Sequence, residues 1–296
     1  MNTKSAMITI AGRPNVGKST LTNYLVGEKI AIVSNKPQTT RNRICGIVTR
    51  EDTQFVFVDT PGYHRARTKL GDYMVNTVRE SIADVDATIL VVEPIASVGS
   101  QESDLIEKIK ASKCPAILAI NKIDTVEKDS LLEVIAAYSE SGIFDAIIPI
   151  SAKTGDGVDA LLETCGKYAV ESPFLFDEDL TTDQPERQVM AEIIREKILW
   201  NLDKEIPHGT AVEITRFSER DSGVIDIDAT IYCEKASHKG IIIGKAGAML
   251  KKISSQARHD CEKFMGTKVY LTTWVKIKEN WRDSDFLVRN FGYNDK

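Results

Sequence analysis

The sequence reads GRPNVGKS from Gly12 to Ser19, which matches the phosphate-binding pattern G-x-x-x-x-G-K-[ST]. An alternating, β-prone run precedes it over 7–11, and apolar residues at helical spacing follow it over 20–27. A strand, a glycine loop and a helix in this order direct backbone N–H groups and a helix N-terminus at one anion. We therefore expect a phosphate site in which Lys18 reaches the β- and γ-phosphates and Ser19 offers its hydroxyl to Mg²⁺.

The composition is that of an ordinary soluble protein of about two domains. The chain has 296 residues, with 42% hydrophobic and 27% charged residues and a net charge of -5. Its 5 cysteines lie far apart without a C-x-x-C pair, which argues against a disulfide framework or a zinc site and for a reducing compartment. The sequence shows neither a signal peptide nor an apolar run long enough to span a membrane. We therefore expect a cytoplasmic protein.

Strands and helices alternate through the first half of the chain. Residues 44–49 and 53–58 are expected to form strands joined by a turn at 50–52, and further strands are expected at 86–92, 115–120 and 146–150. Helices are expected at 72–83, 101–111, 131–139 and 158–168, and the segment 63–71 is expected to be a mobile loop. This order predicts an α/β domain with a mixed, mostly parallel sheet and helices on both faces, with ligands at the carboxyl ends of the strands.

Two polar motifs follow expected strands. Asp59-Thr60-Pro61-Gly62 ends the run at 53–58; a carboxylate there is placed to hold Mg²⁺, often through water, and the Gly62 N–H to approach a γ-phosphate. Asn121-Lys122-Ile123-Asp124 follows the strand at 115–120. A buried Asp124 would accept two hydrogen bonds from guanine and stay unpaired against adenine, which costs about 1–3 kcal/mol or more. Guanine is therefore the expected base.

The residues around Asp124 have expected roles as well. Asn121 is expected to tie its loop to the phosphate loop, and the Lys122 stem to cover one face of the base. Ser151-Ala152-Lys153 ends the strand at 146–150, where the Ala152 N–H is expected to meet the guanine O6.

Together with Thr39-Thr40, these stretches resemble the five motifs of the GTPase superfamily, in a form similar to its translation-factor-related branch that serves ribosome assembly. The resemblance implies that one threonine, in our interpretation Thr40, closes onto Mg²⁺ and the γ-phosphate. Asn15 resembles an asparagine that ligates K⁺ in related enzymes, where K⁺ would act as an arginine finger does. Tyr63 stands where many GTPases carry a water-orienting Gln, so we expect slow intrinsic GTP hydrolysis that a partner accelerates.

The candidate residues of the GTP site fall into three groups. The catalytic candidates are Lys18, Thr40, Gly62 and Asn15, and the metal candidates are Ser19, Thr40 and Asp59. The nucleotide-binding candidates are Gly12, Arg13, Pro14, Asn15, Val16, Gly17, Lys18, Ser19, Thr20, Asp59, Thr60, Pro61, Gly62, Asn121, Lys122, Asp124, Ser151, Ala152 and Lys153.

An acidic stretch with two prolines, 171–186, predicts a linker between a GTPase domain at 1–170 and a second domain at 187–296. In the second domain we expect a helix at 188–202, strands at 211–217, 224–233 and 267–278, and a terminal helix at 281–293. Trp274 and Trp281 are expected in its core.

The second domain contains Gly244-Lys245-Ala246-Gly247 before an amphipathic helix, which resembles the K-homology signature. In that family a G-x-x-G loop clamps a nucleic-acid backbone. From 235 to 282 eleven Lys and Arg stand against three Asp and Glu, the electrostatic footprint of a polyanion partner. The element order resembles the α+β type II topology. A clamp of this kind reads splayed bases, so we expect single-stranded RNA as the partner rather than duplex DNA. The candidate RNA-binding residues are Gly244, Lys245, Ala246, Gly247, Lys251 and Lys252.

A GTPase domain followed by a K-homology domain resembles the bacterial Era family over essentially the whole chain. The resemblance implies GTP/GDP and Mg²⁺ as cofactors, 16S ribosomal RNA near its 3′ end and the 30S subunit as partners, and weak peripheral association with the inner membrane. We expect a monomer. Two alternatives stay open: an RNA-binding assembly factor whose nucleotide site is only structural, and a GTPase whose basic face binds a membrane surface.

Overall fold

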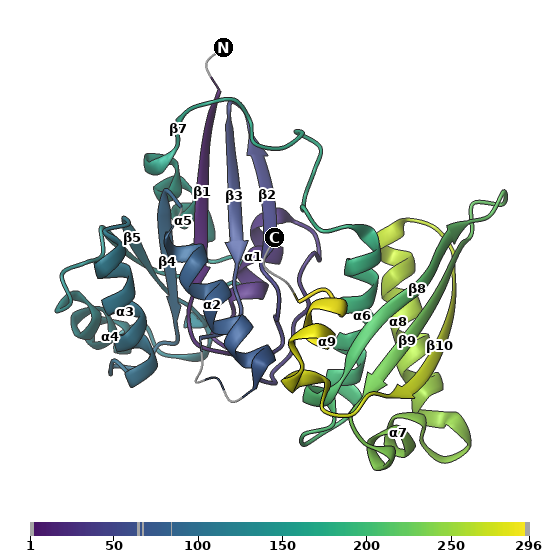
Figure 1. The fold of residues 1–296 in the computed structure, drawn as a ribbon. Coiled ribbons are helices and arrows are strands. Elements are labelled where there is room, and N and C mark those ends of the chain that lie inside the picture. The colour runs from purple at the N-terminus through teal and green to yellow at the C-terminus, as the bar shows by residue number, and fades with distance from the viewer. Residues whose placement is uncertain (1–2, 64–65, 67, 84, 294–296) are drawn as a thin grey trace. The chain divides into compact units, whose positions relative to one another are not determined.

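The computed structural model describes residues 3–63, 66, 68–83 and 85–293 (Figure 1). Contacts divide the chain into two compact units. The first comprises Met1–Ala31, Thr40–Ala66 and Gly71–Asp183, and the second comprises Ile32–Thr39, Arg67–Leu70 and Gln184–Lys296. The short segment Ile32–Thr39 thus belongs with the C-terminal part of the chain, although it precedes Thr40 of the first unit.

The first unit is built on one mixed sheet. Its strands run in the order β2-β3-β1-β4-β5-β6, and β7 pairs with β1. Only the β2–β3 and β1–β7 pairs are antiparallel, so the predicted mostly parallel sheet is confirmed. The strands are β1 (Lys4–Ala11), β2 (Ile44–Arg50), β3 (Thr53–Asp59), β4 (Ala87–Val92), β5 (Ala116–Ile120), β6 (Ala146–Pro149) and β7 (Val170–Glu171).

Helices cover both faces of this sheet (Figure 1). Helices α1 (Lys18–Val26) and α5 (Val158–Cys165) share one apolar core with the strands. Helices α2 (Lys69–Ala83), α3 (Ser100–Ser112) and α4 (Ser130–Ser139) share the other. In β4, Ile89 and Val91 face the first core, while Leu90 and Val92 face the second. Burial on both faces explains why such strands appear in the sequence as continuous apolar runs.

Most of the acidic stretch at 171–186 is bonded to the edge of the first unit. The buried Gln54 side chain accepts from the N–H groups of Leu175 and Phe176 at 2.8 and 3.0 Å. Farther along, Ile47 N–H donates to the Thr181 carbonyl at 2.9 Å, and Cys45 N–H to Asp183 Oδ1 at 3.1 Å. The stretch therefore has a fixed path up to Asp183, the last residue of the first unit.

The second unit has the α-β-β-α-α-β order expected for a type II K-homology fold. Its elements are α6 (Glu186–Asn201), β8 (Ala211–Glu219), β9 (Ile225–Cys233), α7 (Ala236–Ile243), α8 (Ala248–Met265) and β10 (Val269–Ile277). The sheet order is β10-β9-β8, with β9 parallel to β10 and antiparallel to β8. Apolar residues of α6 and α8 pack with the strands into one core; Figure 1 labels these elements.

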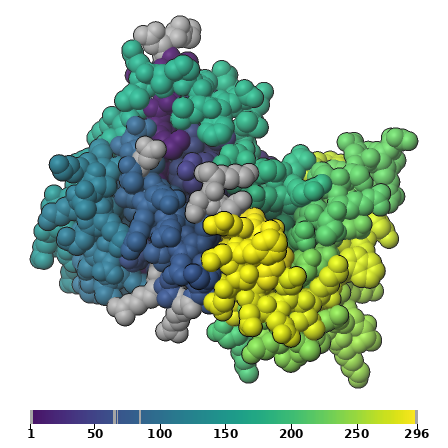
Figure 2. All heavy atoms as spheres, viewed as in Figure 1, coloured from purple at the N-terminus to yellow at the C-terminus, as the bar shows by residue number. Residues whose placement is uncertain are grey.

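The C-terminal part of the chain corrects two expectations. The helix expected at 281–293 is divided into η5 (Trp281–Asp283) and α9 (Asp285–Asn290), because the Ser284 hydroxyl caps the second helix by accepting from Leu287 N–H. Trp281 is buried as expected, and its indole N–H donates to the Gly209 carbonyl at 3.0 Å. Trp274 is not in the core: 59% of it is exposed, because it lies on the face of β10 opposite to Val269, Leu271 and Val275, which pack into the core. Figure 2 shows these last residues in yellow on the molecular surface.

Among the residues that the structure describes, no helix combines the length and the apolar character needed to cross a membrane.

Candidate functional site

The polar motifs of the first unit follow parallel strands and therefore meet at one edge of the sheet (Figure 1). Gly12 follows β1, Asp59 ends β3, Asn121 follows β5, and Ser151 comes two residues after β6. These four strands run in the same direction, because the pairs β3–β1, β1–β4, β4–β5 and β5–β6 that connect them are all parallel. The predicted convergence of the motifs is confirmed.

The phosphate loop holds Lys18 in its interior. The buried Lys18 ammonium donates to the carbonyls of Gly12 and Arg13 at 3.1 and 2.9 Å. Burial lowers the pKa of Lys18 to about 8, and the nearby Asp59 carboxylate opposes this shift. A cation held at this depth is stabilised by an anionic ligand in the loop. Gly17 has φ 101°, and a Cβ there would overlap the Asn121 side chain, so the loop requires glycine at this position.

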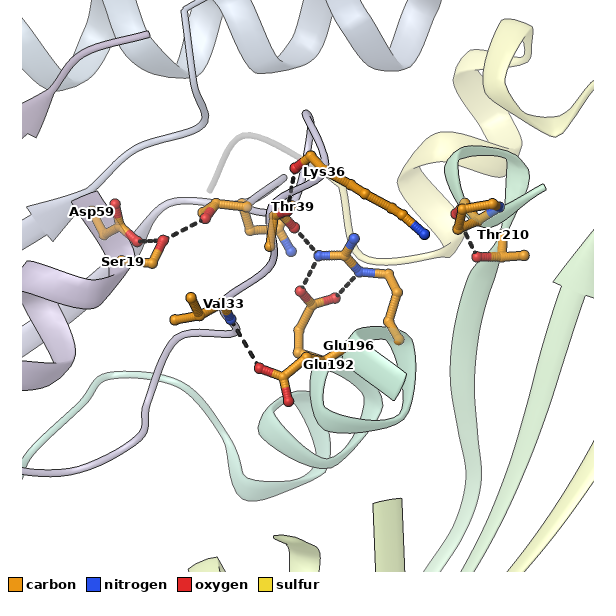
Figure 3. Close-up of polar contacts among 12 residues, drawn as sticks. Ser19, Val33, Lys36, Thr39, Asp59, Glu192, Glu196 and Thr210 are labelled. Carbon is orange, nitrogen blue, oxygen red and sulfur yellow. Dashed lines mark hydrogen bonds and ion pairs between the residues drawn. The ribbon is translucent and has the colours of Figure 1, made fainter. Parts of the chain in front are cut away.

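Three oxygen-bearing side chains meet beside the loop (Figure 3). The Ser19 hydroxyl donates to Asp59 Oδ2 at 2.7 Å and lies 2.8 Å from the Thr40 hydroxyl. Asp59 Oδ1 is buried without a hydrogen-bond partner among the described residues. Burial raises the pKa of Asp59 to about 6, and Lys18 opposes this shift. A buried carboxylate oxygen and two hydroxyls form a donor set that suits Mg²⁺, a hard cation that prefers oxygen.

Thr39 and Thr40 lie in different surroundings. Thr40 is buried beside Ser19, whereas the Thr39 hydroxyl donates to the Lys36 carbonyl at 2.6 Å. Of the pair, only Thr40 joins the oxygen cluster.

The loops expected to bind the base are bonded to the phosphate loop. Asn121 Nδ2 donates to the Val16 carbonyl at 2.7 Å, and Asn121 Oδ1 accepts from the Ala152 N–H at 2.9 Å. Lys122 Nζ donates to the Asn15 carbonyl at 2.7 Å. The structure thus agrees with the expected tie between the Asn121 loop and the phosphate loop.

Two details of the base site differ from expectation. Asp124 is exposed rather than buried, because it lies in the short helix η1 (Ile123–Thr125) beyond the end of β5. Its Oδ1 accepts from the Ser151 hydroxyl at 2.7 Å, which orients the carboxylate. The Ala152 N–H donates to Asn121, so its contact with a guanine O6 stays a prediction.

Glu93 is a site residue that the motif search missed. Its carboxylate pairs with Arg13 and with Lys122, each at 2.5 Å. Arg13 pairs in addition with the buried Glu102 at 2.8 Å. Glu93 directly follows the buried strand β4, so the rule that drew attention to Asp59 and Asn121 would have found it. It joins the phosphate loop to the base-side loop.

The remaining candidates of the first unit line the same edge. Tyr63, which stands where many GTPases carry a Gln, accepts a hydrogen bond from Lys108 at 2.8 Å, and that ammonium lies 4.5 Å from its ring centroid. A Cβ on Gly62 would lie 2.8 Å from Pro14, so the D-T-P-G motif passes close to the phosphate loop. Thr60 donates to the Ile10 carbonyl, and Asn15 is exposed with φ 66°. The loop expected at 63–71 falls partly on residues 64, 65 and 67, outside the described residues, and its last part is helical, because α2 begins at Lys69.

In the second unit, the G-x-x-G loop joins α7 to α8. Gly244 and Gly247 have φ 72° and 78° and Ala246 has φ 51°, so three of the four residues of this loop have a positive φ. A Cβ on Gly244 would lie 2.9 Å from the Met249 nitrogen, whereas one on Gly247 would meet nothing within 4 Å. The side chains of Lys245, Lys251 and Lys252 are exposed. Cations beside the start of α8 form a surface that suits a phosphate backbone.

Comparison with known families agrees with both halves of the chain. The family described as "50S ribosome-binding GTPase" matches residues 7–122, and the KH domain family matches residues 205–282. Over 99% of its length the chain is 52% identical to GTPase Era of Ruminiclostridium cellulolyticum, covering 98% of that protein. It is 50% identical to GTPase Era of Clostridioides difficile, with 99% of each chain covered.

Solved structures give the same result. The fold matches the crystal structure of Aquifex aeolicus Era Y63A bound to GDP.AlF4- with a TM-score of 0.95, 36% identity, and 99% and 100% of the two chains covered. It matches a structure of Era in complex with MgGDPNP and nucleotides 1506–1542 of 16S ribosomal RNA with a TM-score of 0.94, the same identity and the same coverage. The chain therefore belongs to the Era family of GTPases, with a P-loop GTPase domain followed by a C-terminal KH domain.

Proposed function

We propose that this GTPase is a Mg²⁺- and GTP-dependent switch that binds 16S ribosomal RNA near its 3′ end and acts in the cytoplasm in assembly of the 30S subunit. The observation that carries the proposal is the position of Thr40 beside Ser19 and Asp59. A threonine from a loop closes there onto the metal-binding residues, as a γ-phosphate-dependent switch requires.

The roles of the site residues follow from the geometry. Ser19, Thr40 and Asp59 would hold Mg²⁺, which neutralises charge on the phosphate oxygens. Lys18 contributes its charge to the β- and γ-phosphates, and the Gly62 N–H approaches the γ-phosphate during attack by water. Catalysis of this reaction depends mainly on positioning and electrostatic stabilisation. Asn15 is proposed to hold K⁺; equal GTP turnover in NaCl and KCl would remove that role.

Asp124 is proposed to select guanine, and Asn121 to hold its loop on the phosphate loop. The Asp124 carboxylate is exposed and oriented by Ser151, so the base itself would shield it from water. The Lys122 stem, held by Glu93 and the Asn15 carbonyl, would cover the face of the base.

For RNA, the support is the exposed G-x-x-G loop and the excess of basic residues around it. The candidates Gly244, Lys245, Ala246, Gly247, Lys251 and Lys252 lie in or just after the loop. The structure that describes Era with nucleotides 1506–1542 of 16S ribosomal RNA, at 36% identity over nearly the whole chain, favours the same RNA region for this protein.

The test compares binding of the full chain to single-stranded RNA from the 3′ end of 16S ribosomal RNA and to a scrambled RNA, for the wild type and Gly247→Asp. The added carboxylate has room and repels phosphates, so selective binding should fall at least about tenfold, or 1.4 kcal/mol. Gly223→Asp is the matched control: Gly223 has φ 77°, and a Cβ there meets nothing within 4 Å. Equal, weak binding to both RNAs that Gly247→Asp leaves unchanged would contradict the RNA-binding function.

The same assay separates the alternatives. Equal affinity for RNA and for vesicles of anionic lipid would favour a membrane surface as the partner of the basic residues. Selective RNA binding without detectable GTP turnover, even with RNA and K⁺ present, would favour an assembly factor whose nucleotide site is structural.

A further inference from the structure

Helix α6 binds the segment that leads into Thr40. This segment, Ile32–Thr39, belongs to the second unit, and we call it the α6-bound segment. Figure 3 shows the contact of Val33 with Glu196 and, at Thr39, the guanidinium that Glu192 holds. Thr39 is bound to α6 and Thr40 lies beside Ser19. One peptide bond therefore joins the α6-bound segment to the oxygen cluster.

Hydrogen bonds hold the start and the middle of the α6-bound segment. At its start, Val33 N–H donates to Glu196 Oε1 and the Trp200 indole donates to the Val33 carbonyl, both at 2.9 Å. In its middle, the Lys36 ammonium donates to the Leu199 carbonyl at 2.6 Å, to the Leu202 carbonyl and to Asp203 at 3.0 Å. A cation at the last carbonyls of a helix is favoured by the helix dipole.

At the end of the segment, Arg195 reaches the backbone. Arg195 has no exposed surface, and its guanidinium is held by Glu192 at 2.8 and 2.5 Å. Arg195 Nη2, one of the atoms that donate to Glu192, also donates to the Thr39 carbonyl. This carbonyl and the Thr40 N–H belong to one planar peptide unit. A donor that fixes the Thr39 carbonyl therefore restricts the orientation of Thr40.

We propose that Arg195 is a positioning residue for the GTP state, which sets Thr40 for Mg²⁺ and the γ-phosphate from the first helix of the KH domain. The inference rests on the proposed function, in which Thr40 closes onto those groups. In the structure, the contact of Arg195 with Thr39 and that of Thr40 with Ser19 exist together, so the two contacts are compatible in one arrangement of the chain. Coupling of this kind is reciprocal: a nucleotide that orders Thr40 also stabilises the α6-bound segment on α6.

The test measures the affinities of the full chain for MgGTPγS and MgGDP. Thr40 serves only the nucleotide with a γ-phosphate, so Arg195→Met should weaken MgGTPγS binding about tenfold and change MgGDP binding less than twofold. Arg195→Lys should recover part of the loss because it retains a donor. Lys36→Met should show a selective loss of the same kind, because it removes a second side-chain contact that holds the α6-bound segment, the contact with the Leu199 and Leu202 carbonyls and Asp203. Arg220→Met is the control: it removes an arginine of the second unit that pairs with Asp226 at 2.5 Å, and both affinities should keep wild-type values.

The outcomes separate the inference from the proposed function. A wild type that binds neither nucleotide contradicts the function. A wild type that binds both, with an unchanged MgGTPγS-to-MgGDP ratio in Arg195→Met and Lys36→Met, contradicts the inference alone. An equal loss of both nucleotides also contradicts it, because a general structural defect lowers both affinities. Should Arg195→Met fail to fold, as seen by circular dichroism, Lys36→Met decides on the same ratio.

Discussion

The two ligand sites of this molecule rest on different kinds of support. The nucleotide site lies at the ends of parallel strands, and hydrogen bonds such as Asn121 to Val16 and Ser151 to Asp124 join its loops. The G-x-x-G loop lies between two helices, and its lysines are exposed. The first site is preorganised for one ligand geometry. The second presents charge and a close backbone approach, which suits a flexible polyanion.

This comparison predicts that single changes have larger effects in the first site. Lys18→Met should lower affinity for both GTP and GDP by at least about a hundredfold, because a buried cation beside the phosphates is lost. Isothermal titration calorimetry measures both affinities. A loss below tenfold with unchanged stoichiometry would show that the ammonium is not at the phosphates.

Gly17→Ala should be the next largest effect. The new methyl overlaps Asn121 Nδ2, at a residue with φ 101°, so both the phosphate loop and its tie to the base loop are strained. We expect a loss of about tenfold or more in GDP affinity and of about 1–3 kcal/mol in stability, measured by urea unfolding. Gly27→Ala, at φ 79° with nothing within 4 Å, is the matched control for backbone strain alone. Equal effects of the two substitutions would contradict a steric role for Asn121.

Glu93→Gln should have an intermediate effect. It removes the charge that pairs with Arg13 and Lys122, so the phosphate loop and base loop are held less firmly. GTP and GDP affinities should fall together by about threefold to tenfold. A loss of affinity confined to GTP would contradict this role. Glu93 would then act on the GTP state alone, as is proposed for Arg195.

The smallest effects are expected at the exposed lysines of the second site. Lys251→Gln and Lys252→Gln should each weaken RNA binding modestly, for every RNA sequence alike. Each should reduce by about one the slope of log affinity against log salt concentration. Fluorescence anisotropy at several KCl concentrations measures the slope, and GTP affinity serves as the internal control. Slopes equal to that of the wild type would place these lysines away from the phosphates.

Much of the nucleotide site could be predicted because short motifs and buried strands are local features. Strands such as β4 and β5 are apolar on both faces, and their order predicts which loops meet. Asp124 was expected to be buried, but the position of η1 beyond the strand end leaves it exposed. Trp274 lies on the face of β10 opposite to Val275, and the sequence of that strand does not reveal that this face stays exposed.

The contacts of Arg195 could not be predicted for another reason. Arg195 meets Thr39 across 156 residues, and neither residue belongs to a motif that pairs it with the other. The periodicity of α6 predicts an apolar face, but it does not indicate that a buried arginine on that helix holds a loop backbone. Contacts of this range follow from tertiary structure alone. Glu93, in contrast, was within reach, because it directly follows a buried strand.

The most direct test of the account is the affinity of the full chain for RNA from the 3′ end of 16S ribosomal RNA, measured with MgGDP and with a non-hydrolysable MgGTP analogue. If the two sites form one switch, the two nucleotide states should differ in RNA affinity by about fivefold or more. Saturating RNA should change the ratio of analogue to GDP affinity by the same factor. Identical RNA affinities in both states, with nucleotide affinities unchanged by RNA, would contradict a coupled switch and leave two independent sites on one chain.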